Sequence, residues 1–415
     1  MIARIRPRSL RGEVAAIPSK SEAHRMLICA ALADAPTQIR MGPGSQDIDA
    51  TLRCLTAFGA QIAREADCIR VHPIRTPAAR CEADCGESGS TLRFLLPVAA
   101  ALGVDARFIL HGRLPQRPIA PLDRELERGG CALSRPEKNA LRICGQLRPG
   151  KYELPGNVSS QYISGMLFAL SLLEGESVLR IEGEMESASY VEMTLQALGR
   201  FGATPRRTAD GFIVTGRPRF CSPGAVRVGG DWSNAAFWLC ADALPDCAVK
   251  MTGLDADSAQ GDRKIVDALR ALARAGADEC VLDAADTPDM VPAMAACACT
   301  RGQSLRVVHA ERLRIKESDR LAAVTRTLNA LGGAAEETAD GLIVHARRLR
   351  GGSVDAFGDH RIAMMVALAS IACAEEVVLR GAESVNKSYP GFWRDFAALG
   401  GCVELSEEDA HEQQL

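Results

Sequence analysis

The sequence predicts an α/β fold built from six repeated units, and three observations support this prediction. Polar loops recur about every seventy residues, and each opens an apolar stretch typical of a buried helix. Strand-like runs follow, such as SVLRIEG at 177–183 and AVKMTGL at 248–254. An amphipathic helix then closes each unit. The six loops begin at Pro18, Gly86, Asn157, Gly230, Thr287 and Gly358.

Each closing helix is expected to end at a small-residue turn that contains glycine. Glycine supplies the left-handed backbone conformation that terminates helices. Six such turns in step with six polar loops favour internal duplication over chance. These glycines are Gly59, Gly129, Gly202, Gly276, Gly332 and Gly400.

The repeat has a geometric consequence for binding. If equivalent helices point the same way, their amino-terminal ends gather on one side of each domain. Unpaired N–H groups and positive dipole ends then meet there, and such a surface binds anions.

Composition limits the classes of protein that the chain can be. Its 415 residues, 47% of them hydrophobic, suffice for two or three domains with real cores. The apolar stretches are too short to span a membrane, and MIARIRPRSLRGE lacks the core of a secretory signal. We therefore expect a soluble cytoplasmic protein. Residues 406–415 are acidic and aperiodic, and we expect a frayed tail there.

Charge and cysteine content exclude further classes. A net charge of -3 and 4% aromatic residues argue against nucleic-acid binding. The 15 cysteines are odd in number, and most lie among alanines and leucines, which predicts buried reduced thiols. Cys81 with Cys85, and Cys297 with Cys299, lack a second pair at zinc-site spacing, so no metal is expected. No Walker or dinucleotide-binding glycine pattern is present, which disfavours a nucleotide cofactor.

The polar loops in the first half of the chain carry cations and small polar side chains. Lys20 and Arg25 at a helix start oppose the helix dipole, which suggests an anionic ligand. Arg117 lies on a proline-bounded segment suited to bidentate binding of phosphate or carboxylate. The alternative for the segment with Lys20 and Arg25 is an ordinary helix start capped by Ser19 or Ser21. The remaining candidates of this half are Gly89, Ser159, Ser160 and Gln161.

The second half adds the candidate carboxylates. Asp289 precedes an apolar run, where its alternative role is a helix cap. RIKESDRLAAV is expected to place Lys316, Glu317 and Arg320 at a helix opening, with Lys316 and Arg320 on one face and Glu317 within reach of Arg320. The alternative is a solvated helix with surface ion pairs. Further candidates are His360, Arg361 and Lys387. Many cations, few carboxylates and no nucleophilic triad fit two anionic substrates joined by proton transfer.

An ordered set of motifs resembles the EPSP synthase family (3-phosphoshikimate 1-carboxyvinyltransferases), which belongs to the enolpyruvyl transferases. The resemblance runs nearly the full length and rests on SKS, GSTLR, QRPI, SSQ, QGD, PDMVP, KESDR and DHRIAM. It implies an inside-out α/β barrel fold with two similar domains of three βαβαββ repeats each, closing over the substrates. One domain would comprise 1–18 and 230–415, and the other 19–229, with crossings near Ile17–Ser19 and Val228–Asp231.

The resemblance also implies a reaction. The enolpyruvyl group of phosphoenolpyruvate would move to the 5-hydroxyl of 3-phosphoshikimate, with release of phosphate, in chorismate and aromatic amino-acid biosynthesis. It implies a monomer that needs neither metal nor organic cofactor. Acid-base catalysis and electrostatics suffice for this chemistry.

Site residues are implied position by position. Asp289 is the candidate base and Glu317 the candidate acid, while Lys20 and His360 are candidates to assist, and Tyr190 would pack on the shikimate ring. The implied contacts of 3-phosphoshikimate are Lys20, Ser21, Arg25, Ser159, Ser160, Gln161, Ser187, Asp289 and Lys316. The implied contacts of phosphoenolpyruvate are Lys20, Gly89, Arg117, Gln161, Arg320, Arg361 and Lys387.

The sequence departs from one common family pattern at three positions where asparagine is frequent, namely His24, Glu87 and Arg312. Arg312 is therefore assigned no role. Gly89 resembles the glycine that leaves room for the inhibitor glyphosate, so sensitivity to it is expected.

Two other functions remain open at this point. UDP-N-acetylglucosamine enolpyruvyl transferase shares the fold but uses another acceptor and typically a loop cysteine; KESDR, SSQ and DHR favour the shikimate enzyme. A binding protein that only sequesters anions would leave Asp289 and Glu317 without a task.

Overall fold

The computed structural model describes residues 1–216 and 219–407, and the chain forms two compact units. The central unit comprises Pro18–Gly230 and Asp257–Gln260. The terminal unit comprises Met1–Ile17, Asp231–Ala256 and the chain from Gly261 onward. Within the described ranges, no helix has the length and apolar character needed to cross a bilayer.

Three four-stranded sheets of the central unit share one topology. In each, a parallel pair is extended by two antiparallel neighbours, in the orders β14-β3-β5-β4, β6-β7-β9-β8 and β10-β11-β13-β12. Their strands are β3 (Thr37–Arg40), β4 (Gln61–Glu65), β5 (Cys68–His72), β6 (Arg80–Asp84), β7 (Asp105–Ile109), β8 (Cys131–Ser134), β9 (Ala140–Gly145), β10 (Lys151–Pro155), β11 (Gly175–Glu182), β12 (Arg206–Thr208), β13 (Gly211–Gly216) and β14 (Ala225–Arg227).

The terminal unit repeats this topology in the sheets β16-β17-β19-β18 and β20-β21-β1-β22, and it adds the parallel pair β15-β2. The amino-terminal strand β1 takes a place in the sheet that a later strand would fill in a continuous unit. These strands are β1 (Ile2–Arg6), β2 (Arg11–Ala15), β15 (Ala248–Thr252), β16 (Cys280–Asp283), β17 (Leu305–Val308), β18 (Ala334–Glu337), β19 (Leu342–His345), β20 (Gly352–Asp355), β21 (Val377–Arg380) and β22 (Cys402–Ser406).

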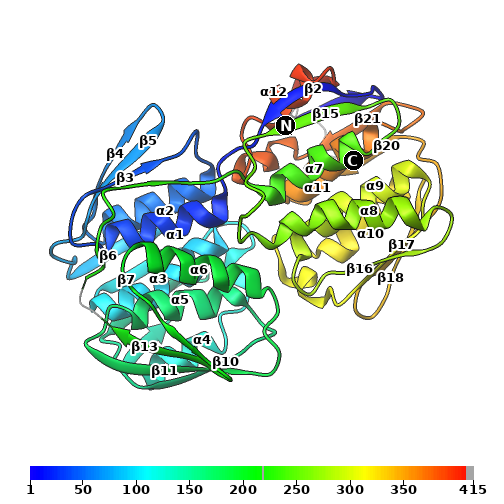
Figure 1. Ribbon diagram of the computed structural model, residues 1–415. Coiled ribbons are helices and arrows are strands. Elements are labelled where there is room, and N and C mark those ends of the chain that lie inside the picture. Colours follow the sequence, from blue (N-terminus) through cyan, green and yellow to red (C-terminus); the bar gives the residue numbers. More distant parts are fainter. Residues whose placement is uncertain (217–218, 408–415) are drawn as a thin grey trace. The chain divides into compact units, whose positions relative to one another are not determined.

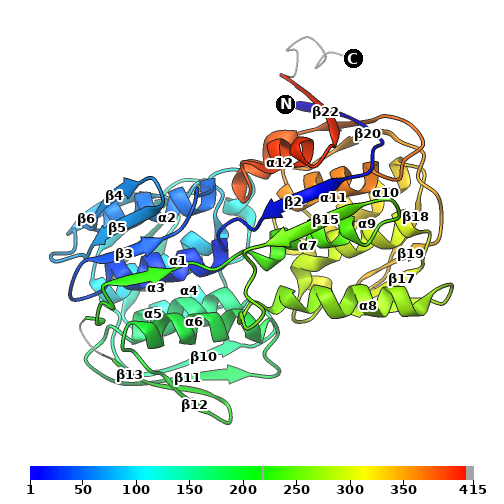
Figure 2. The ribbon, with the colours of Figure 1, turned by 45° about the horizontal axis from the view of Figure 1, so that its top comes forward.

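Helices fill the interior of each unit while sheets lie outside them (Figures 1 and 2). The helices that follow the polar loops are almost wholly buried, and every residue of α11 is buried. These core helices are α1 (Lys20–Ala31), α3 (Gly89–Leu102), α5 (Ser160–Leu170), α7 (Trp232–Asp242), α9 (Val291–Arg301) and α11 (His360–Ser370). The amphipathic helices are α2 (Gln46–Ala57), α4 (Leu122–Arg128), α6 (Ala188–Arg200), α8 (Ile265–Ala275), α10 (Arg320–Ala330) and α12 (Phe392–Ala398). The predicted inside-out α/β fold is confirmed.

The predicted helix-ending glycines are correct at five of the six turns. Gly59, Gly202, Gly276, Gly332 and Gly400 all have positive φ. The prediction for Gly129 is wrong by one residue, because its φ is -75° and the next residue, Gly130, carries the positive φ of 105°. Because Gly129 and Gly130 are both glycine, either could adopt a positive φ, and the hydrogen bonds of the turn select Gly130.

The polar loops end in side-chain caps. Ser19, Ser88, Ser159 and Asp359 accept hydrogen bonds from the first turns of α1, α3, α5 and α11. Capping satisfies N–H groups that helix starts leave open. The predicted frayed tail at 406–415 is wrong at Ser406, which belongs to β22. Residues 408–415 lie outside the described residues. All 15 cysteines are free thiols, and Cys29, Cys54, Cys240 and Cys373 are buried as expected.

Candidate functional site

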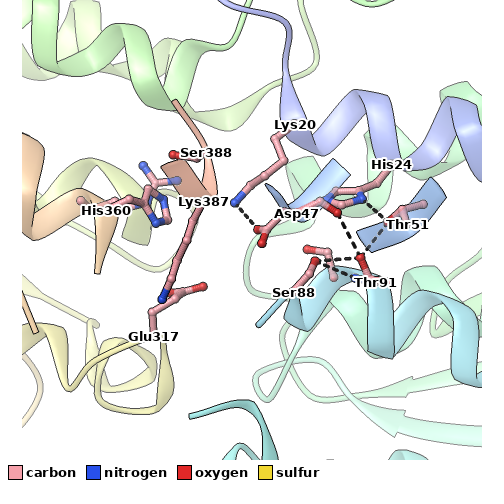
Figure 3. A network of polar contacts seen from close by, with 12 residues as sticks. Lys20, His24, Asp47, Thr51, Ser88, Thr91, Glu317, His360, Lys387 and Ser388 are labelled. Carbon is pink, nitrogen blue, oxygen red and sulfur yellow. Dashed lines mark hydrogen bonds and ion pairs between the residues drawn. The ribbon is translucent and has the colours of Figure 1, made fainter. Parts of the chain in front are cut away.

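The candidate residues form two groups, one in each unit. In the central unit, Lys20 is the first residue of α1, and its Nζ lies 2.8 Å from Asp47 Oδ2. Asp47 belongs to the first turn of α2, and Figure 3 shows the pair. Sequence reasoning missed Asp47, because its place in the first turn of a helix indicates only a helix start and not a partner for Lys20.

Arg25 lies inside the central unit, with a guanidinium that joins three helices. Its Nη1 donates to Ser21 O at 2.6 Å, its Nη2 to Tyr190 O at 2.7 Å and its Nε to Thr194 Oγ1 at 2.8 Å. The guanidinium also stacks over Phe94, 5.0 Å from the ring centre. Burial lowers the pKa of Arg25 to about 10, so it remains a cation at neutral pH.

Three candidates, Gly89, Arg117 and Gln161, lie close to Arg93 at the amino ends of α3 and α5. Arg93 Nη1 donates to Gln161 Oε1 at 2.7 Å, and Gln161 Nε2 donates to Ser90 Oγ at 2.9 Å. A Cβ atom placed on Gly89 would lie 2.7 Å from Arg117 Nη1 and 3.1 Å from Arg93 Nη1. Two guanidiniums therefore approach one glycine at a helix start, where backbone N–H groups also favour an anion. Arg93 stood in the GSTLR motif but was assigned no role.

The other neutral candidates of the central unit lie at helix starts. Ser159 caps α5, and Ser160 is the first residue of that helix. Ser187 precedes α6 with a φ of 53°, a left-handed conformation that is unfavourable for a residue with a side chain. Tyr190 lies in the first turn of α6.

The terminal unit gathers its candidates around Arg320, whose side chain is only 2% exposed. Arg320 binds Asp289 through Nη1 at 2.8 Å, Glu317 through Nη2 at 2.6 Å and Asp359 through Nε at 2.8 Å. The other oxygen of Asp289 accepts from Arg361 Nη2 at 2.7 Å. The amino ends of α10 and α11 and the segment before α9 thus meet at one carboxylate, Asp289.

This arrangement excludes two of the simpler interpretations of the sequence, a surface helix at RIKESDRLAAV and a helix cap at Asp289. The exposed-helix interpretation of RIKESDRLAAV is wrong, because Arg320 is buried. Helix α10 begins only at Arg320, so Lys316 lies before it and does not share a helix face with Arg320. The predicted contact between Glu317 and Arg320 is confirmed. Asp289 does not act as a side-chain cap of α9; it forms two ion pairs instead.

The charges of this group shift one another. Burial would raise the pKa of Asp289, but Arg361, Arg320 and Lys316 outweigh it and hold that pKa below its usual range. Burial would lower the pKa of Arg320, yet Asp359, Glu317 and Asp289 raise it. Asp289 is therefore ionised and Arg320 protonated at all physiological pH values.

The pKa of Lys316 is lowered, because the nearby carboxylates only partly offset the effect of burial. Burial, Arg320 and Arg312 lower its pKa, Asp289 opposes them, and the result is about 8. Arg312 itself donates a hydrogen bond to Ala285 O, in the segment before Asp289. Lys316 is thus a cation whose charge changes just above neutral pH.

Three further residues complete the terminal group. His360 is buried at the start of α11, with Nδ1 3.9 Å from Asp359 Oδ1. Lys387, at the end of the 3-10 segment Ala382–Lys387, donates through Nζ to Gly358 O at 2.6 Å. Asp262 was missed, although it ends the QGD motif; it bonds Ser233, and burial with Asp289 nearby raises its pKa to about 6. Among residues 1–216 and 219–407, no cluster of His, Cys, Asp and Glu could hold a metal ion.

The structure has the same fold as a solved enolpyruvyl transferase and a solved EPSP synthase. The structure matches the crystal structure of the enolpyruvyl transferase NikO from Streptomyces tendae with a TM-score of 0.75, at 20% identity, over 97% of this chain and 98% of that one. It matches EPSP synthase from Acinetobacter baumannii with a TM-score of 0.79, at 22% identity, over 98% of this chain and all of that one. Sequence similarity then identifies the family.

The family model of EPSP synthase (3-phosphoshikimate 1-carboxyvinyltransferase) matches residues 5–396. A 3-phosphoshikimate 1-carboxyvinyltransferase from Clostridium beijerinckii is 39% identical over 97% of this chain and 98% of its own length. Another from Clostridium acetobutylicum is 37% identical over 99% of both chains. The chain belongs to the EPSP synthase family.

Proposed function

We propose that this chain transfers the enolpyruvyl group of phosphoenolpyruvate to the 5-hydroxyl of 3-phosphoshikimate and releases inorganic phosphate. The product is 5-enolpyruvylshikimate 3-phosphate, on the route to chorismate and the aromatic amino acids. Relatives with this name cover nearly the whole chain. The observation that carries the proposal is the group around Asp289, in which three carboxylates and two arginines share direct ion pairs.

The reaction needs two proton transfers and strong stabilisation of negative charge. A proton added to the methylene carbon of phosphoenolpyruvate makes C2 electrophilic, and the 5-hydroxyl oxygen bonds to C2 as it loses its proton. The tetrahedral ketal then loses phosphate by cleavage of its C–O bond, and loss of the methyl proton restores the double bond. We assign the first proton to Glu317, whose carboxylate must take up a proton from solvent before it can donate, and the acceptor role at the hydroxyl to Asp289.

A carboxylate with a depressed pKa is a weak base, so Asp289 needs a change on substrate binding. Its pKa is held down by Arg361 and Arg320, both of which we assign to phosphoenolpyruvate. When these guanidiniums bind the phosphate or carboxylate of that substrate, their hold on Asp289 weakens. The pKa of Asp289 rises in consequence, and the group becomes a competent base only when the substrate is present.

The anions of the substrates are assigned to cations and helix starts of both groups. For phosphoenolpyruvate these are Lys20, Gly89, Arg117, Gln161, Arg320, Arg361 and Lys387. For 3-phosphoshikimate they are Lys20, Ser21, Arg25, Ser159, Ser160, Gln161, Ser187, Asp289 and Lys316, with Tyr190 against the ring. Charge-assisted hydrogen bonds from Arg and Lys are the strong interactions available to such ligands. We assign to His360 and Lys20 an assisting role in the proton transfers.

Phosphate release separates this function from its rivals. The protein is incubated with phosphoenolpyruvate and either 3-phosphoshikimate or UDP-N-acetylglucosamine, and free phosphate is measured. We expect release only with 3-phosphoshikimate. Release only with the nucleotide sugar would assign the chain to the other enolpyruvyl transferase, and binding without release in either mixture would leave an anion-binding protein.

We further propose a cytoplasmic enzyme that works as a monomer and is inhibited by glyphosate. Unchanged turnover in the presence of excess glyphosate would contradict the inhibition.

The pKa of Lys316 predicts an alkaline limit of activity. Because this pKa is lowered to about 8, the side chain is a cation below that pH and neutral above it. We expect kcat/KM for 3-phosphoshikimate to fall by roughly tenfold per pH unit above 8, since an uncharged amine binds phosphate poorly. Lys316→Arg should move this limit upward, because a guanidinium keeps its proton. Lys264→Arg, at an exposed lysine paired with Asp286, should leave the profile unchanged. An identical limit in Lys316→Arg would refute the assignment.

Gly89→Ala should weaken phosphoenolpyruvate and glyphosate binding. The new Cβ would lie 2.7 Å from Arg117 Nη1 and 3.0 Å from Arg117 Cζ, so the guanidinium must move. We expect KM for phosphoenolpyruvate and the half-inhibitory glyphosate concentration each to rise by about tenfold or more, because bidentate contacts depend on fixed geometry. Gly199→Ala is the control, since a Cβ there meets nothing within 4 Å. Wild-type values in Gly89→Ala would exclude Arg117 from the binding site.

A further inference from the structure

We propose that His24, Thr51 and Thr91 position Lys20 and the amino end of α3 for phosphoenolpyruvate binding, through one directed chain of hydrogen bonds. All three side chains are fully buried, so they act through other residues rather than on the substrate. His24 Nδ1 lies 2.7 Å from Thr51 Oγ1, and Thr51 Oγ1 lies 2.7 Å from Thr91 Oγ1 (Figure 3). The assignment to phosphoenolpyruvate rests on the proposed function.

The Thr91 end of this hydrogen-bond chain contacts residues beside both Lys20 and the amino end of α3. Thr91 Oγ1 donates to Ser88 Oγ at 2.8 Å, and it lies 3.4 Å from the carbonyl oxygen of Asp47. Ser88 caps α3, whose first residue is Gly89. Asp47 holds Lys20 through its carboxylate. The relay therefore connects the start of α1, the start of α2 and the start of α3.

His24 sets the direction of these hydrogen bonds. Burial, together with Lys20 and Arg25, lowers the pKa of His24 well below its usual value, so the ring is neutral and carries one N–H. Nε2 has no hydrogen-bond partner within the described part of the chain. A hydrogen on Nδ1 spares the protein a buried N–H without an acceptor, which is the rarer and costlier defect.

Only one order of donors then satisfies the chain. A hydroxyl has a single hydrogen to donate. With Nδ1–H of His24 as first donor, Thr51 donates to Thr91, and Thr91 remains able to donate to Ser88 or to Asp47 O. If Nδ1 were instead an acceptor, Thr51 would donate to it and Thr91 would donate to Thr51. Thr91 would then have no hydrogen for Ser88 or for Asp47 O.

The middle hydroxyl offers the cleanest test. Thr51→Val keeps the shape of the side chain and removes the hydrogen bonds on both sides of it. We expect KM for phosphoenolpyruvate to rise by about tenfold, with kcat changed less than about threefold, because Lys20 and Gly89 lose their relative placement while the proton-transfer groups stay intact. Thr51→Ser should restore the wild-type KM. Thr327→Val is the matched control, because that buried hydroxyl in α10 has no partner among the described residues.

A second pair of variants tests the direction of the relay at His24. His24→Asn places an amide N–H at the same δ position and should keep KM within about threefold of wild type, whereas His24→Leu should raise KM as Thr51→Val does. A merely structural role would lower the thermal midpoint of both variants without separating their KM values. Equal KM values in His24→Asn and His24→Leu would overturn the proposal.

The tautomer can be read without any substrate. Nitrogen-15 NMR of the wild-type protein, with the His24 signals identified by their loss in His24→Asn, should show a neutral ring protonated at Nδ1 at pH 7. A ring protonated at Nε2, or an imidazolium, would overturn the relay even if the enzyme is active. If 3-phosphoshikimate gives no phosphate release in wild type, the proposed function fails, while the NMR result still decides the relay.

Discussion

Glu317→Gln is expected to lower kcat by roughly two to four orders of magnitude, the usual effect of removing a catalytic acid. Glu317 Oε2 lies 2.6 Å from Arg320 Nη2. The amide oxygen of glutamine can still accept this hydrogen bond, so Arg320 keeps its three partners and the fold of the site is preserved. What the variant lacks is a proton to give to the methylene carbon of phosphoenolpyruvate.

The measurement is steady-state turnover with both substrates varied. KM values within about threefold of wild type would separate lost chemistry from lost binding. Glu311→Gln serves as the control, because Glu311 is an exposed carboxylate only six positions earlier. A wild-type kcat in Glu317→Gln would remove Glu317 from the mechanism.

Asp289→Ala should produce a loss of similar size in kcat, again about two to four orders of magnitude, because the acceptor of the hydroxyl proton is gone. The structure adds a second consequence. Asp289 holds both Arg320 and Arg361, which we assign to phosphoenolpyruvate. Their release should also change KM for that substrate, whereas Glu317→Gln should not.

Two comparisons make this result interpretable. Arg320 keeps Asp359 and Glu317 as partners in Asp289→Ala, so we expect the variant to fold with a lowered thermal midpoint. Asp286→Ala removes a nearby surface carboxylate that pairs with Lys264, and it should leave kcat unchanged. Undiminished turnover in Asp289→Ala would require a different base at the 5-hydroxyl.

The difference between the two variants reflects where each carboxylate stands in the network. Glu317 contacts Arg320, which also binds Asp289 and Asp359, so its replacement leaves two carboxylates on that arginine. Asp289 bridges two arginines, so removal of its charge disturbs both proton transfer and anion binding. Non-additive effects are therefore expected when Asp289→Ala is combined with changes at Arg361.

Much of the fold followed from local signals in the sequence. A capping serine such as Ser19 and a glycine such as Gly59 mark helix boundaries, because caps and left-handed turns involve only residues close together in the chain. The sixfold recurrence of loop, buried helix and strand identified the fold class. The motifs likewise located most of the polar residues that the structure brings together.

The partners of these residues were less accessible. Asp359 caps α11, and it is also a buried partner of Arg320, 39 positions away. Asp47 pairs with Lys20 over 27 positions, and Asp289 reaches Arg361 over 72. No periodicity specifies such pairs, because they depend on how separate repeats pack.

The sequence alone thus determined that polar loops open the core helices, which residues are charged and that the units repeat, since these depend on short-range backbone hydrogen bonds and side-chain polarity. Only the tertiary structure decided which charges neutralise each other and which remain available to a ligand. The physical reason is burial: once Arg320 leaves water, its partners must come from whichever loops the packed helices bring within hydrogen-bond distance.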